Sequence, residues 1–503
     1  MLLSGTAGPK DRTGIWTLSL ADGTLRKLVD DAMWGAALSA DESHILFRRS
    51  SAAPEIWIAN TNGGEARKLL DASSNGAHSS QLVWLPDGHR FAFGSANQIG
   101  DRFSILSYDL ETRRTNAILS DPSAGNFCFT RDGRLIYTRL EGTSNEQSSN
   151  LWEVEIDRRT AVARGTPRRL TNWSGFLFGS LAISSDGRRL AFARLHFQNN
   201  VYVGELEDKG KRLIHTRRVS FEQWTNWPTG WSRDSHSVFF NSDRNGHLNV
   251  FEQQIGTGAL HAVAMGEEEQ RDARLSPDGS WILYLAWPRV QGQIRTGEGR
   301  LMRIAADGGT THTVTPVSGY PGRVRIDPLT SLSAAFHPAF RCASVGNASC
   351  VLSEVVDGQA VFTALDPLEG RRGELTRMPE SSFSFWDLSP DGRWLALGKQ
   401  DQASGRIHLI PLAGGTPREI SAGDWTNLQS VTWARNGQAL YLTAFASKGG
   451  PLLRVALNGE AQLLHRGIKY VENPVESLDG RYLAFGEMTE EGNAWVIDTP
   501  RRK

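Results

Sequence analysis

One short turn, in most copies Asp-Gly and in three of them Pro-Asp-Gly, recurs along the whole of this 503-residue chain. Its central residue is, in order, Asp41, Asp87, Asp132, Asp186, Asp234, Asp278, Asp391, Asn436 and Asp479. Successive turns are separated by 43 to 54 residues, except for one gap of 113 residues that holds a further copy of the pattern at 337–380, without the turn. Self-similarity at a fixed period indicates an array of one structural unit.

Short apolar segments surround each turn and predict four β-strands in every repeat. The segment after the turn is apolar, as in FAF at 91–93 and LAL at 395–397. A strand of the Ile-Trp type follows, as in EIWIAN, and then a Gly-rich turn with a short basic strand, as in GGEARKL. Four strands per repeat of about 45 residues, with 51 glycines for turns and 16 tryptophans for packing between sheets, predict an all-β fold. We expect a β-propeller of about eleven four-stranded repeats.

These residues resemble the TolB-like, WD-repeat-like β-propeller family over essentially the whole chain. The resemblance implies a scaffold rather than a particular chemistry. We expect two tandem propellers: a partial one of about four blades at 1–164 and a seven-bladed one at 165–503, closed by the segment GTPRRLTNW at 165–173. Two other divisions stay open, namely seven blades followed by four, and five combined with six.

The composition and the missing motifs exclude several classes of function. Lys+Arg and Asp+Glu both number 55, so the formal charge is zero and gives no reason to expect nucleic acid as a partner. No apolar run reaches the length of about 18 residues that spans a membrane. The sequence lacks GxSxG, GxxxxGK[ST], HExxH and the protein-kinase signatures. We therefore expect no catalytic activity, no cofactor and no metal.

The N-terminal sequence bears on the cellular location of the protein, and the three cysteines bear on disulfide and metal chemistry. The opening MLLSGTAGPKDRTG lacks the features of a signal peptide, so the sequence as written predicts a cytoplasmic protein, or a periplasmic one if a signal or anchor lies upstream. Cys342 and Cys350 flank a hairpin and could meet, but we interpret them as two half-buried thiols. With Cys128 they fit no zinc pattern.

Two groups of polar residues are candidates for a binding site. The eight aspartates among the turn residues could form a ring of carboxylates around a channel and bind a cation, but Asp in such a turn usually accepts backbone N–H groups, and we favour this structural role. The segment SDRNGHLNVF at 242–251 contains the second group, Asp243, Arg244, Asn245 and His247. It predicts a tight Asn-Gly hairpin, with a polar loop on a binding face as the alternative.

The finer texture resembles the C-terminal propeller region of bacterial winged-helix transcriptional regulators and eukaryotic-like Ser/Thr kinases. It is carried by RRLTNWSGF, WPTGWSRDSHSVFFNSDRNGH and GRIHLIPLAGGTPREI. The resemblance implies a non-catalytic sensory or interaction module that binds a protein, peptide or small ligand on a propeller face. One alternative is a TolB-type periplasmic envelope or transport component. Another is a propeller-type hydrolase or lyase, for which His, Arg and Asp side chains should converge at a channel mouth.

Overall fold

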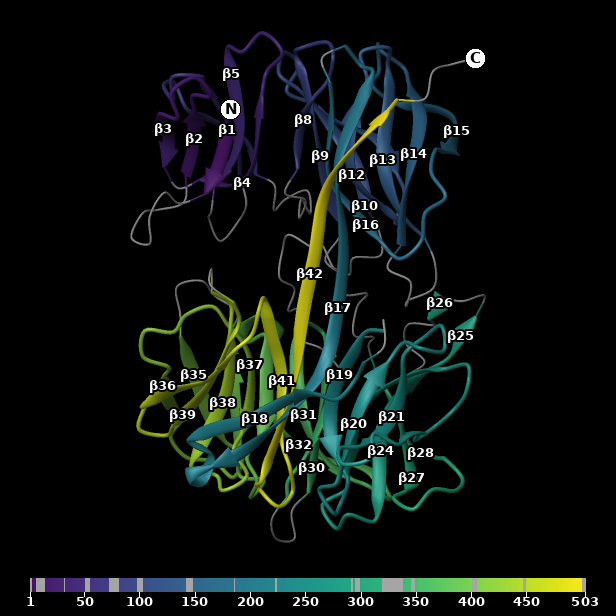
Figure 1. Ribbon diagram of the computed structural model, residues 1–503, viewed down its shortest axis with the longest axis vertical. Helices are drawn as coiled ribbons and strands as arrows, with labels where there is room; N and C mark the ends of the chain where they lie inside the picture. Colours follow the sequence, from purple (N-terminus) through teal and green to yellow (C-terminus); the bar gives the residue numbers. More distant parts are fainter. Residues whose placement is uncertain are drawn as a thin grey trace. The chain divides into compact units, whose positions relative to one another are not determined.

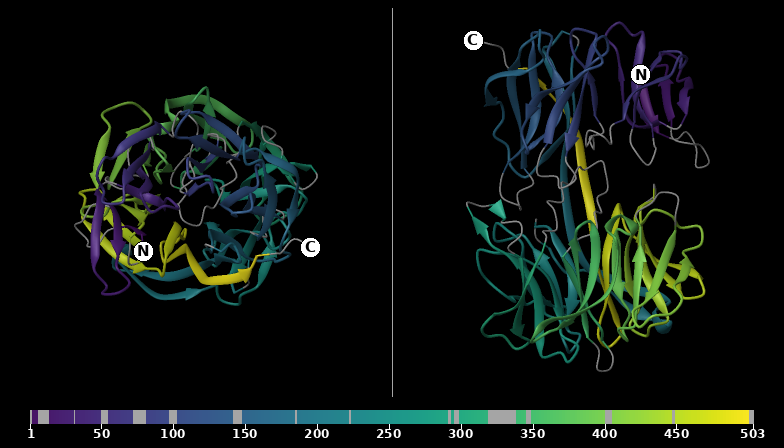
Figure 2. Two further views of the ribbon diagram at one scale, coloured as in Figure 1. Left: turned by 90° about the horizontal axis from the view of Figure 1, so that it is seen from above. Right: turned by 180° about the vertical axis from the view of Figure 1, so that it is seen from behind.

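The structure is a computed structural model in which nearly all regular elements are β-strands (Figures 1 and 2). The residues it describes are 2–5, 14–30, 32–49, 55–71, 81–96, 103–141, 148–184, 186–221, 224–290, 293–294, 299–318, 338–344, 349–399, 405–446 and 449–499. Within these ranges the helical elements are two short 3-10 turns, η2 (Asp208–Gly210) and η3 (Glu380–Ser382). The prediction of an all-β propeller made of repeated four-stranded antiparallel sheets is confirmed.

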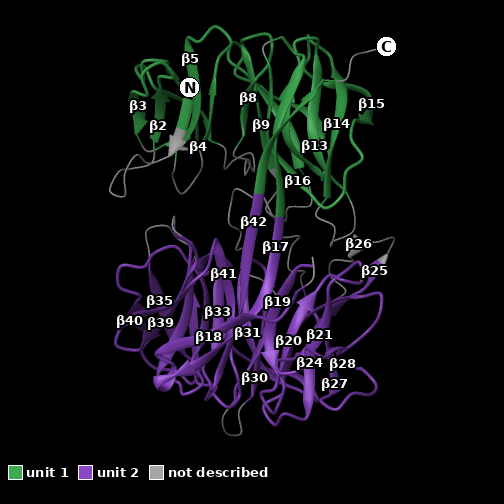
Figure 3. Cartoon of the chain, viewed as in Figure 1, with its two compact units in different colours: residues 1–142, 147–196, 492–503 green, residues 143–146, 197–491 purple. Residues whose placement is uncertain are grey.

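The chain divides into two compact units, which are coloured separately in Figure 3. Unit 1 comprises residues 1–142, 147–196 and 492–503, and unit 2 comprises residues 143–146 and 197–491. Two hydrogen-bonded neighbours, β17 (Arg189–Glu207) and β42 (Tyr482–Asp498), each contribute residues to both units. The chain therefore enters unit 2 along β17 and leaves it along β42.

Unit 1 contains five blades among its described residues. The first four are β1 (Leu2–Gly5), β2 (Gly14–Leu18) and β3 (Leu25–Asp30); β4 (Ala32–Leu38), β5 (His44–Arg49), β6 (Glu55–Asn60) and β7 (Arg67–Asp71); β8 (Leu82–Trp84), β9 (Arg90–Ala96), β10 (Phe103–Asp109) and β11 (Thr115–Ser120); and β12 (Ala124–Phe129), β13 (Arg134–Glu141), β14 (Ser148–Ile156) and β15 (Ala163–Arg169). The fifth blade consists of β16 (Leu177–Ile183) with the unit 1 parts of β17 and β42.

The described residues of unit 2 form six blades. Five of them are β19 (Asn226–Trp231), β20 (Ser237–Ser242), β21 (Asn249–Gln254) and β22 (Leu260–Ala262); β23 (Glu269–Leu275), β24 (Trp281–Trp287), β27 (Gly299–Ala305) and β28 (His312–Val317); β29 (Ala339–Cys342), β30 (Cys350–Val356), β31 (Gln359–Asp366) and β32 (Gly370–Pro379); β33 (Phe385–Leu388), β34 (Trp394–Gly398), β35 (Arg406–Pro411) and β36 (Arg418–Ser421); and β37 (Leu428–Trp433), β38 (Ala439–Ala444), β39 (Pro451–Ala456) and β40 (Ala461–Arg466). A small ribbon, β25 (Arg289–Val290) with β26 (Gln293–Ile294), extends the second blade's loop.

The sixth blade closes the ring of unit 2. Its inner strands are β41 (Tyr470–Glu476) and the first part of β42, and its outer strands are the second part of β17 and β18 (Arg212–Arg218). The first strands of the six blades contact one another in the order β19, β23, β29, β33, β37, β41, and β41 contacts β19 again. Six inner strands therefore surround one central channel.

This arrangement differs from the expected domains 1–164 and 165–503. The segment 165–173 was expected to close the C-terminal ring, but residues up to Arg169 form the outer strand β15 of the blade that begins at β12. Strand β18 supplies the outer edge of the closing blade instead, because β17 pairs with β42 rather than starting a new blade of its own. The described blades thus number five and six instead of four and seven.

The cysteine interpretation is corrected by the structure. Cys342 in β29 and Cys350 in β30 are direct cross-strand partners, with their Cα atoms 3.9 Å apart, and they form a disulfide. Their register places the two sulfur atoms on the same face of the hairpin, which the sequence interval alone does not specify. Cys128 is a buried free thiol, and burial raises its pKa to about 12.

The hydrophobic core lies between neighbouring blades. Trp287 in β24 is fully buried and belongs to the same apolar cluster as Phe340 in β29 of the next blade. Trp386 in β33 meets the ring of Phe362 in β31 edge-on at 5.1 Å between centroids. Large rings fill the wedge between two twisted sheets, which explains the high tryptophan count.

Candidate functional site

The repeated turn residues are engaged locally. The Asp278 carboxylate accepts hydrogen bonds from the Ser276 hydroxyl and from the Ser280 backbone N–H, and the first of these is the main reason that its pKa is lowered. A side-chain oxygen accepts the N–H two residues further on in eight of the nine turns, those of Asp41, Asp87, Asp186, Asp234, Asp278, Asp391, Asn436 and Asp479. Asp132 accepts from the Arg134 guanidinium. These contacts fit a role in turn formation.

The loop between β20 and β21 is also held by local contacts. Asp243 is 4% exposed and accepts the Thr225 N–H, and burial raises its pKa to about 6. Arg244 lies over the Phe251 ring, Asn245 donates to Asn249, and His247 contacts the Gly266 carbonyl oxygen. None of these four candidates lines the channel cavity described below.

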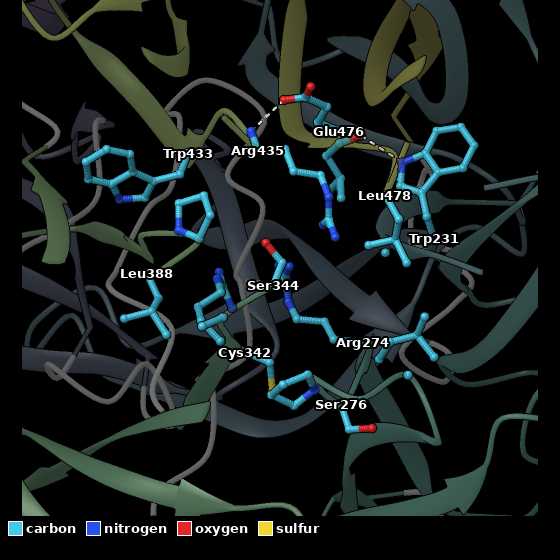
Figure 4. A pocket seen from close by; sticks show the side chains of 18 of the residues that line it. Trp231, Arg274, Ser276, Cys342, Ser344, Leu388, Trp433, Arg435, Glu476 and Leu478 are labelled. Carbon is cyan, nitrogen blue, oxygen red and sulfur yellow. Dashed lines mark hydrogen bonds between the residues drawn. The ribbon is translucent and has the colours of Figure 1, made fainter. Parts of the chain in front are cut away.

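A cavity of about 330 Å³ lies at the end of the unit 2 channel where the inner strands run into their turns (Figure 4). All six blades contribute to its wall, through Trp231, Arg274, Arg341, Leu388, Trp433 and Glu476 among others. Four arginines line it, Arg233, Arg274, Arg341 and Arg435, and besides the turn residue Asp278 its carboxylates are Asp387 and Glu476. Its size is at the lower end of the range for small-molecule sites.

A bulge in β23 positions Arg274. The pairing of β23 with β24 shifts register between Arg271 and Arg274, and Asp272 within the bulge has a φ of 59°. Bulges change the direction of the side chains that follow them. Figure 4 shows Arg274 directed toward the middle of the cavity. Burial, with a smaller contribution from Arg341, lowers the Arg274 pKa to about 10.

Arg274 is unpaired, whereas its neighbour Arg341 is held in an ion pair. No hydrogen bond or ion pair joins the Arg274 guanidinium to any residue that the structure describes, and its buried Nε has no acceptor. Arg341 Nε lies 3.2 Å from Asp387 Oδ1, and Arg341 Nη1 donates to the Phe340 carbonyl oxygen. Asp387 Oδ2 also accepts the Trp433 N–H at 2.8 Å. Burial raises the Asp387 pKa, and the two arginines oppose this rise.

A second arginine reaches the cavity from the β37 blade. The Arg435 backbone N–H donates to Glu476 Oε2 at 2.8 Å, whereas its guanidinium has no hydrogen bond or ion pair among the described residues. Burial lowers the Arg435 pKa and raises that of Glu476. Figure 4 shows the Arg435 side chain extending from its strand end into the same space as Arg274. The cavity thus holds more cationic groups than its own carboxylates satisfy.

Unit 1 offers an internal comparison. Its corresponding cavity, about 420 Å³, is lined by the inner strands β4, β8, β12 and β16. Four residues before the turn residue, these strands carry Ala37, Val83, Cys128 and Ala182. In unit 2 the same position carries Gly230, Arg274, Asp387, Thr432 and Val475. No charged residue lines the described wall of the unit 1 cavity, so charge is particular to unit 2.

The sequence interpretation missed this cluster, although it left a readable signal. Inner strands of a propeller face a narrow channel, so the position four residues before the turn should be small or apolar. Arg274 and Asp387 break that pattern, and a comparison of repeats at this position would have identified them. Among the described residues, no group of His, Cys, Asp and Glu is arranged to hold a metal ion. Nor do the described residues include a helix of the length and hydropathy of a membrane-spanning segment.

Comparison with known proteins finds solved structures that are similar to this chain at low sequence identity. Neither a family model nor a curated protein matches the sequence. Solved structures similar to the chain include a TolB protein from Agrobacterium tumefaciens, with 16% identity, a TM-score of 0.44, and coverage of 58% of this chain and 99% of that one. TolB from Acinetobacter baumannii has 14% identity, a TM-score of 0.22, and coverage of 74% and 78%. The β-propeller domain of the Trilobed protease from Pyrococcus furiosus has 16% identity, a TM-score of 0.27, and coverage of 62% and 93%.

These values carry no statement about activity, ligand or partner. The architecture itself rests on the four-stranded sheets and on the closed ring of inner strands in unit 2. The chain is a β-propeller protein.

Proposed function

We propose that the chain is a non-catalytic recognition module whose ligand site is the channel cavity of unit 2. The observation that carries this proposal is the pair of guanidinium groups, on Arg274 and Arg435, that enter the cavity without a hydrogen-bonded partner among the described residues. Keeping a desolvated cation unpaired costs folding free energy, and a ligand that pairs with it recovers that energy. Sites of this kind recur where a protein gives up stability for binding.

The sensory role in a bacterial signalling protein remains part of the proposal. A propeller presents variable side chains on a fixed frame, which suits recognition coupled to an effector. The Cys342–Cys350 disulfide supports a location where disulfides persist, such as the periplasm, rather than the cytoplasm. A TolB-type envelope component would share that location.

An enzyme of the hydrolase or lyase type is the second candidate. Arg274, Arg341 and Asp387 do converge at a channel mouth, which is part of the arrangement that this alternative requires. Histidine is missing from the described cavity wall, and the Ser276 hydroxyl donates to the turn carboxylate of Asp278 instead of facing a base. The binding function is therefore favoured by the residues present.

A plugged channel tests the proposal. Ser344 lines the cavity, and Ser344→Trp should fill much of it, whereas Val356→Trp adds the same ring at an exposed position, 48% accessible, outside the cavity wall. The full chain and both variants are heated with a panel of defined carboxylic acids, amines, neutral amides and sugars. We expect at least one class to raise the melting temperature of the wild type and of Val356→Trp but not of Ser344→Trp.

Three outcomes would count against the proposal. Equal stabilisation of both variants places the site elsewhere, and no stabilisation by any class removes the support for a small-ligand site. Conversion of a panel member, or of an ester, peptide or oligosaccharide substrate, into product, monitored by chromatography, would favour the hydrolase or lyase function instead.

A further inference from the structure

The wall of the unit 2 cavity contains both charged and apolar side chains. Besides the arginines, Leu275, Leu388, Val475 and Leu478 line it, together with the rings of Trp231 and Trp433. A ligand that satisfies this wall needs a polar anionic group and an apolar body. A sugar would leave the apolar side chains uncovered, and an inorganic ion would leave most of the volume empty.

The number of charges points to a singly charged anion. Besides the exposed Arg233, two guanidinium groups of the wall, on Arg274 and Arg435, lack partners among the described residues, and each can donate two parallel N–H bonds to a planar oxyanion. Asp387 and Glu476 lie in the same wall, and their negative charge opposes a doubly charged group such as phosphate. A carboxylate matches the guanidinium geometry and carries half the charge of a doubly charged phosphate, so Asp387 and Glu476 repel it about half as strongly.

The three carboxylates of the wall are already occupied as acceptors, and Asp278 accepts from Ser276 and Ser280. Asp387 accepts from Arg341 and from the Trp433 N–H, and Glu476 accepts the Arg435 N–H. They therefore offer little to a cationic ligand, although they hold Arg341 and the Arg435 main chain in place. The cationic donors without a partner among the described residues are those of Arg274, Arg435 and the exposed Arg233, and the buried Trp433 Nε1 also lacks an acceptor.

We propose that the unit 2 cavity binds a monocarboxylate with a branched aliphatic body, between the guanidinium groups of Arg274 and Arg435. The carboxylate could belong to a free organic acid or to the C-terminal residue of a peptide, because the recognised group is the same. This inference rests on the proposed function and specifies the ligand class of the same site. Arg274 and Arg435 are its binding residues, and Arg341 is a positioning residue that fixes Asp387.

Isothermal titration calorimetry on the full chain at pH 7 tests the inference. The probe is 4-methylpentanoate, and its neutral amide, 4-methylpentanamide, reports on the apolar contacts alone. We expect the acid to bind and the amide to bind at least about tenfold more weakly, since charge-assisted bonds to guanidinium supply the difference. Arg274→Met and Arg435→Met should each weaken the acid at least about tenfold. Arg406→Met is the matched control, because Arg406 is 61% exposed and pairs with Glu419 away from the cavity.

The source of the carboxylate is resolved with a second pair of probes. N-acetyl-Gly-Leu with a free C-terminus is compared with the same peptide as its C-terminal amide. Tighter binding of the free-acid peptide than of 4-methylpentanoate assigns the site to peptide ends, and the reverse order assigns it to free acids. Inorganic phosphate binding more tightly than both carboxylates would overturn the inference.

The failure of the inference can be distinguished from failure of the proposed function. If acid and amide bind equally and Ser344→Trp abolishes both, the cavity is a ligand site but not a carboxylate site. If Ser344→Trp weakens the binding of none of the probes, both the carboxylate inference and the proposed function are overturned. Unchanged acid affinity in Arg274→Met and Arg435→Met, with circular dichroism showing folded variants, also overturns the inference.

Discussion

Replacing Arg274 by methionine should stabilise the ligand-free protein. The guanidinium is desolvated in the cavity wall, has no hydrogen bond or ion pair among the described residues, and lies near the second cation, Arg341. Methionine keeps much of the length of the side chain and removes the charge. A structural arginine would behave in the opposite way, since its loss would break contacts.

The magnitude follows from the pKa. A fall of the Arg274 pKa from 12.5 to about 10 corresponds to an upper limit of about 3 kcal/mol, at 1.36 kcal/mol per pH unit. Partial solvation in the cavity reduces this, so we expect the unfolding free energy of unit 2 to rise by about 1–2 kcal/mol. For a unit of this size that gives a rise in melting temperature of about 2–3 °C. The sign holds at pH 7, because the group is charged in both states there and only the folded state disfavours the charge.

Differential scanning calorimetry of the full chain without added carboxylate measures the effect. Arg406→Met, which removes an exposed ion pair, should change the same transition by about 0.5 kcal/mol or less. Added 4-methylpentanoate should raise the melting temperature of the wild type and leave Arg274→Met unchanged. A lower melting temperature for Arg274→Met without ligand would instead mean that the guanidinium makes stabilising contacts in the folded protein.

Three further changes test other parts of the structure. Thiol titration of the denatured, unreduced protein should detect Cys128 alone, and three thiols before reduction would contradict the disulfide. Replacing both Cys342 and Cys350 by serine should lower the unfolding free energy by about 2 kcal/mol, because the disulfide closes a loop with a sequence separation of 8. Asp243 stays protonated in the folded state to about pH 6, so the stability of the wild type falls as the pH rises from about 4 to 6. The unfolding free energy of Asp243→Asn relative to wild type should therefore grow by up to about 3 kcal/mol over that range. A difference that does not depend on pH would contradict the raised pKa of Asp243. Asp391→Ala removes two local hydrogen bonds and should lower the unfolding free energy, measured by urea denaturation, by about 1–2 kcal/mol. The control is Asp424→Ala, which changes an exposed aspartate without turn contacts. The destabilisation by Asp391→Ala should be the same with and without added Ca²⁺.

The repeated turn predicted the fold because its chemistry is local. Asp278 accepts N–H bonds from its own turn, and Gly279 takes a φ of 72°, so each copy can be recognised without knowledge of the rest of the chain. The division between units was not predictable in this way. It depends on whether β17 pairs with β42, which lies almost 300 residues further along the chain.

The candidate site was missed for a related reason. Arg274 and Arg435 are far apart in sequence, and only ring closure brings them into one cavity. The loop at Asp243 drew attention because its residues are polar and consecutive, yet the structure shows them bonded to their own surroundings. Consecutive polar residues often satisfy one another, whereas an isolated charge in an apolar strand has no local partner and must find a distant one or a ligand.

In the unit 2 channel, Arg274 and Arg435 are proposed to bind a carboxylate. Crystal structures of the full chain with and without 4-methylpentanoate test this binding. We expect ligand density between Arg274 and Arg435, within hydrogen-bonding distance of both guanidinium groups, and six blades around the channel. Arginines paired with protein carboxylates, and a cavity that stays empty at saturating ligand, would contradict the proposed binding.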